Sequence, residues 1–260
     1  MKKRILSILL LCCMVLTLLP TTVSAADGPM DTIPKYDVSI DVYNRTSDIS
    51  IKDSRSYYIY SSVPDKLRDT WAWDKKIFIK GDKTAPHVFI DGVNIEMSPS
   101  SKGPAIELNK KASAYIYFIG KNSSLQGADG RAAIQKNRSE GQLYVLARTG
   151  TTVTCKGGYR AAGIGGSWAI RNIGDSMFNM DMYGHGVNMH FGSQSNPDYW
   201  GGTIIATGGE YGAGIGAGSW GHSGYSGNTI HGGAGERLYF YSGTINARGG
   251  RLAAGIGGGF

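Results

Sequence analysis

Acidic side chains, the usual catalysts of sugar-bond cleavage, are scarce in the second half of this chain. Enzymes that cut polysaccharides gather carboxylates at one site, for acid and base work or to hold Ca²⁺. Residues 150–260 contain five acids, and no two of them are within five residues of each other: Asp175, Asp181, Asp198, Glu210 and Glu236. The spacing therefore indicates no catalytic pair, although folding could still bring distant acids together.

The histidines and the nucleophilic side chains do not form a recognised catalytic or metal-binding pattern. Gly184-His185-Gly186 resembles a short motif of polygalacturonases, but the paired aspartates and the Arg-x-Lys segment of those enzymes are absent. The sequence also lacks His-Glu-x-x-His, paired-cysteine spacing and a Gly-x-Ser-x-Gly elbow. We expect no catalytic residues, no metal site and no cofactor, and nothing in the sequence supports Ca²⁺ binding.

Aromatic residues give a better candidate site. Tyr159 and Tyr211 precede, and Trp168 and Trp220 follow, two copies of an Ala-Gly-Ile-Gly segment. If those copies stack, their rings could form a row on which sugar faces bind, because exposed aromatic patches commonly mark binding surfaces. The alternative is that the rings cover backbone at the corners of the fold. The candidate ligand-binding residues are Tyr159, Trp168, Tyr199, Trp200, Tyr211 and Trp220.

One unit occurs three times, at residues 151–168, 202–220 and 243–260. Alignment on the Gly-Gly pairs brings large apolar residues together at Val153, Ile204 and Ile245. Small residues coincide two positions later, at Cys155, Ala206 and Ala247. This period of two predicts a short, half-buried strand in each copy. Cys155 then fills an inward slot that alanine fills in the other copies.

Fainter copies lie upstream, at residues 105–108 and 132–135, and longer loops are expected at 169–200 and 221–235. The equivalent isoleucines are Ile106, Ile134, Ile164, Ile215 and Ile256. Further β-rich runs give about three short strands per repeat. Such a unit cannot bury its apolar side alone, but coils stacked about 4.8 Å apart can pair every strand with its neighbours. The predicted fold class is therefore all-β, a parallel β-helix (solenoid) over residues 48–260, after a linker or cap at 26–47.

The high glycine content supports stacked coils, because glycine tolerates the sharp bends and close backbone approach at coil corners. The chain has 39 glycines, and all but eight lie in residues 150–260. No Gly-X-Y period of three exists, which excludes collagen, and the alternation of Ile, Val and aromatics disfavours disorder. A twisted sandwich is disfavoured because the repeats lack clear two-residue hairpin signals.

The first 25 residues have the layout of a secretory signal peptide. Basic residues 2–4 precede an apolar run at 5–19 and the small residues of Val23-Ser24-Ala25. Cleavage would lower the net charge from +7 to +4 and leave Cys155 as the single cysteine, so no internal disulfide could form. We expect a secreted protein with no membrane span after cleavage and no nucleic-acid partner.

The repeats also resemble a known group of proteins. Thr-[Ile/Val]-x-Ala-x-Gly-Gly followed by Ala-Ala-Gly-Ile-Gly-Gly, together with residues 90–109, is similar to secreted β-helix proteins of gut-type Gram-positive bacteria. Many of these are described as carbohydrate-binding-domain or cell-surface proteins. The resemblance implies a right-handed parallel β-helix. The chain ends within a repeat at Gly259-Phe260, so we expect the β-helix to be C-terminally incomplete, with any cell-surface attachment made through a missing C-terminal region.

These observations favour an exported, non-catalytic β-helix module that binds a polysaccharide or a host or cell-wall glycan, or acts as an adhesin or stalk. The alternative is a polysaccharide lyase or glycoside hydrolase of the pectin type on the same scaffold. A purely structural spacer is a third interpretation. An enzyme should gather two acids, or an acid and an arginine, in one groove, whereas a binding module should align aromatics.

Overall fold

The computed structural model describes residues 35–81, 83–98, 103–109, 111–136, 140–171, 184–222 and 229–260. The expected signal peptide, residues 1–25, lies outside this part of the chain. In the described residues the structure is almost entirely β, with one short 3-10 helix, η1 (Asp65–Leu67). No helix there is long and apolar enough to cross a membrane.

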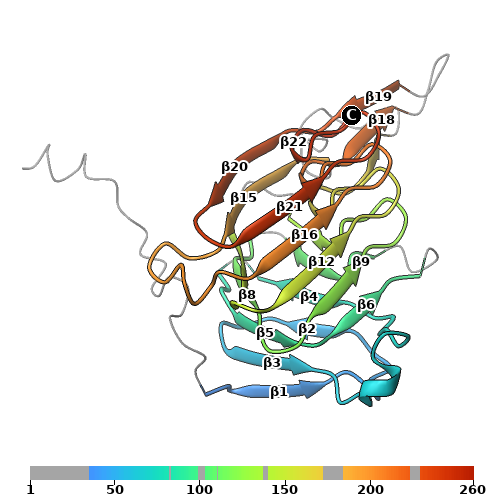
Figure 1. The fold of residues 1–260 in the computed structure, drawn as a ribbon. Coiled ribbons are helices and arrows are strands. Elements are labelled where there is room, and N and C mark those ends of the chain that lie inside the picture. Colours follow the sequence, from blue (N-terminus) through green and yellow to red (C-terminus); the bar gives the residue numbers. More distant parts are fainter. Residues whose placement is uncertain are drawn as a thin grey trace, which may run out of the picture. The chain divides into compact units, whose positions relative to one another are not determined.

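Three parallel sheets form the body of the fold (Figure 1). Sheet A contains β1 (Val38–Asp41), β3 (Ser56–Tyr60), β5 (His87–Asp91), β8 (Ala114–Phe118), β11 (Leu143–Ala147), β15 (Gly186–Phe191) and β20 (Gly235–Phe240). Sheet B contains β2 (Ile49–Ile51), β4 (Ile77–Lys80), β7 (Ile106–Asn109), β10 (Ile134–Gln135), β13 (Ile164–Gly165), β17 (Ile215–Gly216) and β22 (Ile256–Gly257). Sheet C contains β6 (Asn94–Glu96), β9 (Ser123–Gln126), β12 (Thr152–Lys156), β16 (Thr203–Thr207) and β21 (Thr244–Arg248). Each full coil passes from sheet A to C to B, so the predicted parallel β-helix is confirmed.

Strand register confirms the alignment of the repeats. Sheet B places the five expected isoleucines in one column, joined by the pairs Ile106↔Ile134, Ile134↔Ile164, Ile164↔Ile215 and Ile215↔Ile256. Sheet C pairs Val153 with Ile204, and Ile204 with Ile245. The degenerate copies at 105–108 and 132–135 are therefore true coils. Their handedness stays a prediction.

Alternate side chains of each strand point into the space between the sheets. In β12, Val153 and Cys155 are fully buried, whereas Thr152 and Thr154 on the other face are partly exposed. Cys155 pairs in register with Ala206 and lies in the small inward slot that the sequence predicts. Burial raises the pKa of the Cys155 thiol, so this cysteine stays protonated and acts as a small apolar side chain.

The Gly-Gly pairs form the tightest part of the corner between sheets C and B. Gly158, Gly209 and Gly250 follow one another along the stack of coils. A Cβ on each would overlap a backbone carbonyl oxygen of the preceding coil, that of Ala128, Gly158 and Gly209 respectively. Close approach of two backbones therefore requires glycine in this column.

Three segments differ from the expected boundaries, and one of them is the expected loop at 169–200, which contains β14 (Ala169–Arg171). Strand β1 lies inside the expected linker and pairs in parallel with β3, so sheet A begins at Val38 rather than after residue 47. The expected loop at 221–235 contains β19 (Thr229–Gly232), which pairs antiparallel with β18 (Ser219–His222). Strand β18 also pairs in parallel with β14. A small fourth sheet thus extends from the longer turns.

Candidate functional site

The turns between sheets C and B bring several expected site residues together. Lys156 pairs with Thr207 before the turn and Ile164 pairs with Ile215 after it, so the two turns have equal length. The turn between β21 and β22 matches them in the same way. We define the corner cluster as five residues on these turns together with Trp168, which follows β13: Tyr159, Arg160, Trp168, Glu210, Tyr211 and Arg251.

Arg160 lies at the centre of the corner cluster. Its guanidinium carbon is 4.9 Å from the ring centroid of Tyr159, 5.2 Å from that of Trp168 and 5.5 Å from that of Tyr211. The Tyr159 and Tyr211 rings meet edge to face, with centroids 6.3 Å apart. Tyr159 is 42% exposed, whereas Tyr211 is 8% exposed. The arginine therefore holds three rings around one charge, and one of those rings faces solvent.

Arg251 and Glu210 complete the cluster on the next coils. Arg251 donates a hydrogen bond of 2.6 Å to the hydroxyl of Tyr211, and its Nε lies 3.5 Å from a carboxylate oxygen of Glu210. A hollow of about 500 Å³ lies beside them, lined by residues 207–210 and 248–251. The positive charge of Arg251 is thus largely balanced by Glu210.

Backbone conformation gives Arg160 its position. Arg160 has φ of 62°, in the left-handed region that glycine adopts most readily. One coil earlier, the register places Gly130, with φ of 71°, at the equivalent position. The backbone N–H of Trp168 donates to the carbonyl of Gly130 at 2.8 Å, and its ring lies against that glycine. The missing side chain at position 130 leaves space for the indole beside Arg160.

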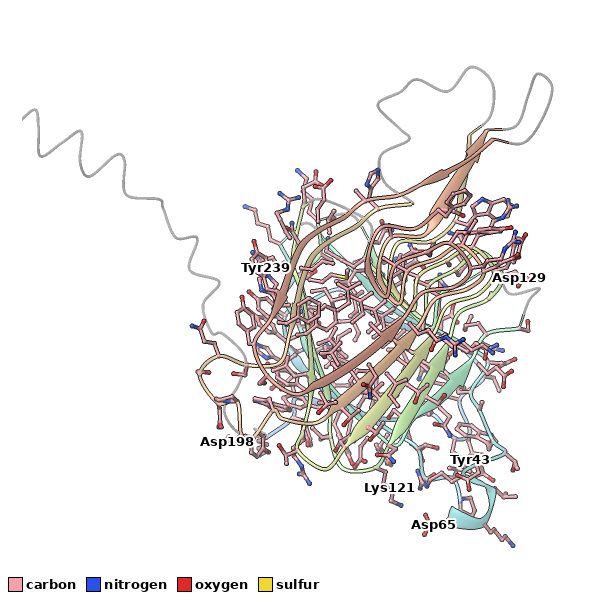
Figure 2. All side chains as sticks on the ribbon, turned by 45° about the horizontal axis from the view of Figure 1, so that its top comes forward. Tyr43, Asp65, Lys121, Asp129, Asp198 and Tyr239 are labelled. Atoms are coloured by element: carbon pink, nitrogen blue, oxygen red, sulfur yellow. The ribbon has the colours of Figure 1, made fainter. Side chains whose placement is uncertain are left out.

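The structure separates the five aromatic candidates whose side chains it describes, so these five do not form one row. Tyr159, Trp168 and Tyr211 lie together at the corner between sheets C and B. Trp200 lies instead at the corner between sheets A and C, where it is 1% exposed and packs on Tyr117. Tyr199 contacts the edge of Trp200. Figure 2 labels Asp129 near the first corner and Asp198 near the second, on well-separated sides of the coils.

Trp200 is unsuited to sugar stacking because it is buried. The long turn between β15 and β16 folds it over the outer face of sheet A, where it covers neighbouring rings. The backbone of Trp220 belongs to β18, and its side chain lies outside the described residues. Among the candidates whose side chains are described, Tyr159 is the one that combines an exposed ring with the corner cluster.

A regular aromatic row does exist, but on the outer face of sheet A. We call it the aromatic ladder, and its members occupy one register position on successive strands: His87, Tyr115, Tyr144, His190 and Tyr239. Neighbouring rings stack with centroids 4.3–4.7 Å apart. Aromatic residues recur at alternate positions in the stretches of sequence that form the strands of sheet A. This recurrence was the signal from which the ladder could have been found. Most of the ladder is buried, which indicates a structural role.

Replacing His190 with phenylalanine should make the protein less sensitive to acid. Burial lowers the pKa of His190 to about 4, from an ordinary value of 6.5. As the pH falls from 6.5 towards 4, the unfolded chain binds a proton that the folded chain does not, so stability decreases. We expect His190→Phe to remove roughly 2 kcal/mol of this decrease. Urea unfolding at pH 7.5 and pH 4.5 measures it, and an equal loss in both proteins would contradict the assignment.

A polar groove of about 640 Å³ runs along sheet C beside η1. Its lining includes Asp65, Arg68, Asp69 and Lys121. Asp65 accepts hydrogen bonds from Lys121 at 3.1 Å and from Arg68 at 3.3 Å, and the bond from Lys121 is the main reason that its pKa is lowered. Asp65 is therefore ionised near neutral pH, whereas a general acid needs a raised pKa.

Within the described residues, no three His, Cys, Asp or Glu side chains converge to hold a metal ion. Asp175 and Asp181, two of the acids noted above, lie outside those residues. In the described part of the chain, the corner cluster and the groove are the candidate binding sites that we consider further. In comparisons with known proteins, no family model, no curated protein and no solved structure matches this chain.

Proposed function

We propose that this protein is an exported, non-catalytic β-helix module that binds a polysaccharide or a host or cell-wall glycan through the corner cluster. The observation that carries the proposal is the exposed ring of Tyr159, held beside Arg160 and Tyr211. A sugar ring has an apolar face of C–H groups that packs on an aromatic side chain. Rigid stacked coils fix the platform before binding, which lowers the entropy cost of association.

The cellular setting rests on the sequence. The signal-like residues 1–25 support export, and the similarity of the repeats to secreted proteins of Gram-positive bacteria supports a place at the cell surface. A glycan-binding module on such a stiff scaffold would act as an adhesin or a stalk. Neither role needs a cofactor.

A second candidate function is cleavage of a pectin-like polysaccharide in the groove on sheet C. The observation in its favour is that the groove gathers two aspartates, an arginine and a lysine: Asp65, Asp69, Arg68 and Lys121. The lowered pKa of Asp65 argues against its acting as a general acid. Incubation of the protein with pectin, followed by an assay for unsaturated or reducing ends, tests this candidate. Product release would overturn the non-catalytic proposal.

Glycan-array binding by the mature chain tests the proposed site. Tyr159→Ala should weaken binding at least about tenfold, equivalent to about 1.4 kcal/mol, since the exposed platform is lost. Tyr239→Ala is a matched control, because Tyr239 has the same exposed fraction of 42% but lies on the aromatic ladder. We expect the control to bind like the unmodified protein. Binding that survives Tyr159→Ala, or that is absent from every glycan, would overturn the proposal.

A further inference from the structure

An unbalanced positive charge lies within the corner cluster. Glu210 is the acid of the cluster, and it pairs with Arg251. Among the described residues, no ion pair joins a carboxylate to Arg160. Lys156 and Arg248 lie nearby at one register position of sheet C, each paired with Thr207, and add further positive charge. This face of the turns therefore attracts anions.

Two hydrogen-bond donors in the cluster also lack acceptors in the described structure. They are Nε of Arg160 and Nε1 of Trp168, both buried. A buried donor without a partner destabilises the folded protein, and a charged donor does so more strongly. Folded proteins rarely keep such groups, and an ion bound beside them is one reason for those that occur.

The backbone of the turn fixes where the Arg160 side chain begins. Arg160 has φ of 62°, and Leu252, at the equivalent position of the last described coil, has φ of 65°, so the left-handed conformation belongs to this turn. Glycine at position 130 adopts the same conformation without strain. The charge and the unpaired donors thus converge on Arg160.

We infer that the corner cluster binds an acidic sugar, a pyranose that carries a carboxylate, within a polysaccharide. This inference rests on the proposed glycan binding and names the class of glycan. The guanidinium fork matches the two oxygens of a carboxylate. Tyr159, with its ring centroid 4.9 Å from the guanidinium carbon, supplies the platform for the sugar face. The next unit of the chain would lie over the neighbouring hollow, where Arg248 supplies a positive charge and Glu210 pairs with Arg251.

Binding to uronate-containing glycans, each compared with its carboxyl-reduced form, tests the inference. The mature protein should bind at least one uronate glycan, and reduction of the carboxylates to neutral alcohols should weaken that binding at least tenfold. Arg160→Asn should cause a similar loss, because asparagine tolerates the left-handed conformation but carries no charge. Arg160→Lys should retain part of the affinity. Higher salt should weaken binding of the acidic form.

A control variant and the pattern of glycan binding distinguish a failure of this inference from a failure of the proposed function. Arg237 also has a left-handed backbone, with φ of 53°, and lies on β20 outside the cluster, so Arg237→Asn makes the same substitution elsewhere. It should leave binding unchanged. One outcome would overturn the acidic-sugar inference and leave the proposed function standing. In that outcome the protein binds only neutral or sulfated glycans, Tyr159→Ala loses this binding, and Arg160→Asn keeps it. Absence of binding to every glycan would overturn both.

Discussion

Replacement of Gly209 by alanine is expected to destabilise the protein by more than about 3 kcal/mol. The added Cβ would overlap the carbonyl oxygen of Gly158 on the preceding coil. That carbonyl belongs to backbone and cannot rotate away as a flexible side chain would. Parallel ladders on both sides of the turn hold the two coils at a fixed separation. Gly250 stacks on Gly209 in the same way, so a shift of one turn disturbs the next.

Gly258→Ala provides the control for Gly209→Ala. Its nearest neighbour would be the carbonyl oxygen of Gly233 at 3.4 Å from the new Cβ, an ordinary contact. Alanine also restricts the unfolded chain, which favours folding by up to about 1 kcal/mol. We expect this variant to unfold at nearly the same urea concentration as the unmodified protein. Equal midpoints for Gly209→Ala and Gly258→Ala would contradict the argument that close backbone approach requires glycine at the corner.

The sequence predicts the fold well because the inward-facing residues of each coil must pack in the same way against those of the next coil. An isoleucine that points inward must meet the inward residue of the next coil, so Ile164 and Ile215 occupy matching places in their repeats. The same constraint reveals even the degenerate coil around Ile106, where glycine is missing. The pairing register of the strands thus follows from the alternation of inward and outward residues and from the spacing of the repeats, and both can be read from the sequence.

The site is harder to predict because it depends on the parts that do not repeat. Tyr199 and Trp200 resemble the other aromatic candidates, but the long turn that carries them lies at a different corner. Arg160 was missed because an arginine occurs once at that position, where the other coils have Gly130, Tyr211 and Leu252. This position differs in every coil, so the repeat pattern does not single out Arg160. Its contacts with Tyr159 and Trp168 require the three-dimensional register of the turns.

The column of isoleucines in sheet B should be the main source of stability in the middle coils. Ile164 is fully buried and lies between Ile134 and Ile215 in the register. Ile164→Ala removes apolar contacts on both sides and leaves a cavity between coils. The ladders that fix the coil spacing prevent the cavity from collapsing, so the cost should approach the upper part of the range of about 2–5 kcal/mol.

The same substitution in the last coil should have a much smaller effect. Within the 260 residues given, Ile256 is the last member of this column, on β22, and is 46% exposed. Ile256→Ala removes contacts with one neighbouring coil and opens no enclosed cavity, so we expect a loss below about 1.5 kcal/mol. In a solenoid, stability is approximately a sum of coil and interface contributions, and a residue with two interfaces should therefore matter more than one with a single interface. Urea unfolding of both variants measures the difference, and equal losses would show that burial within the column does not set the stability of its coils.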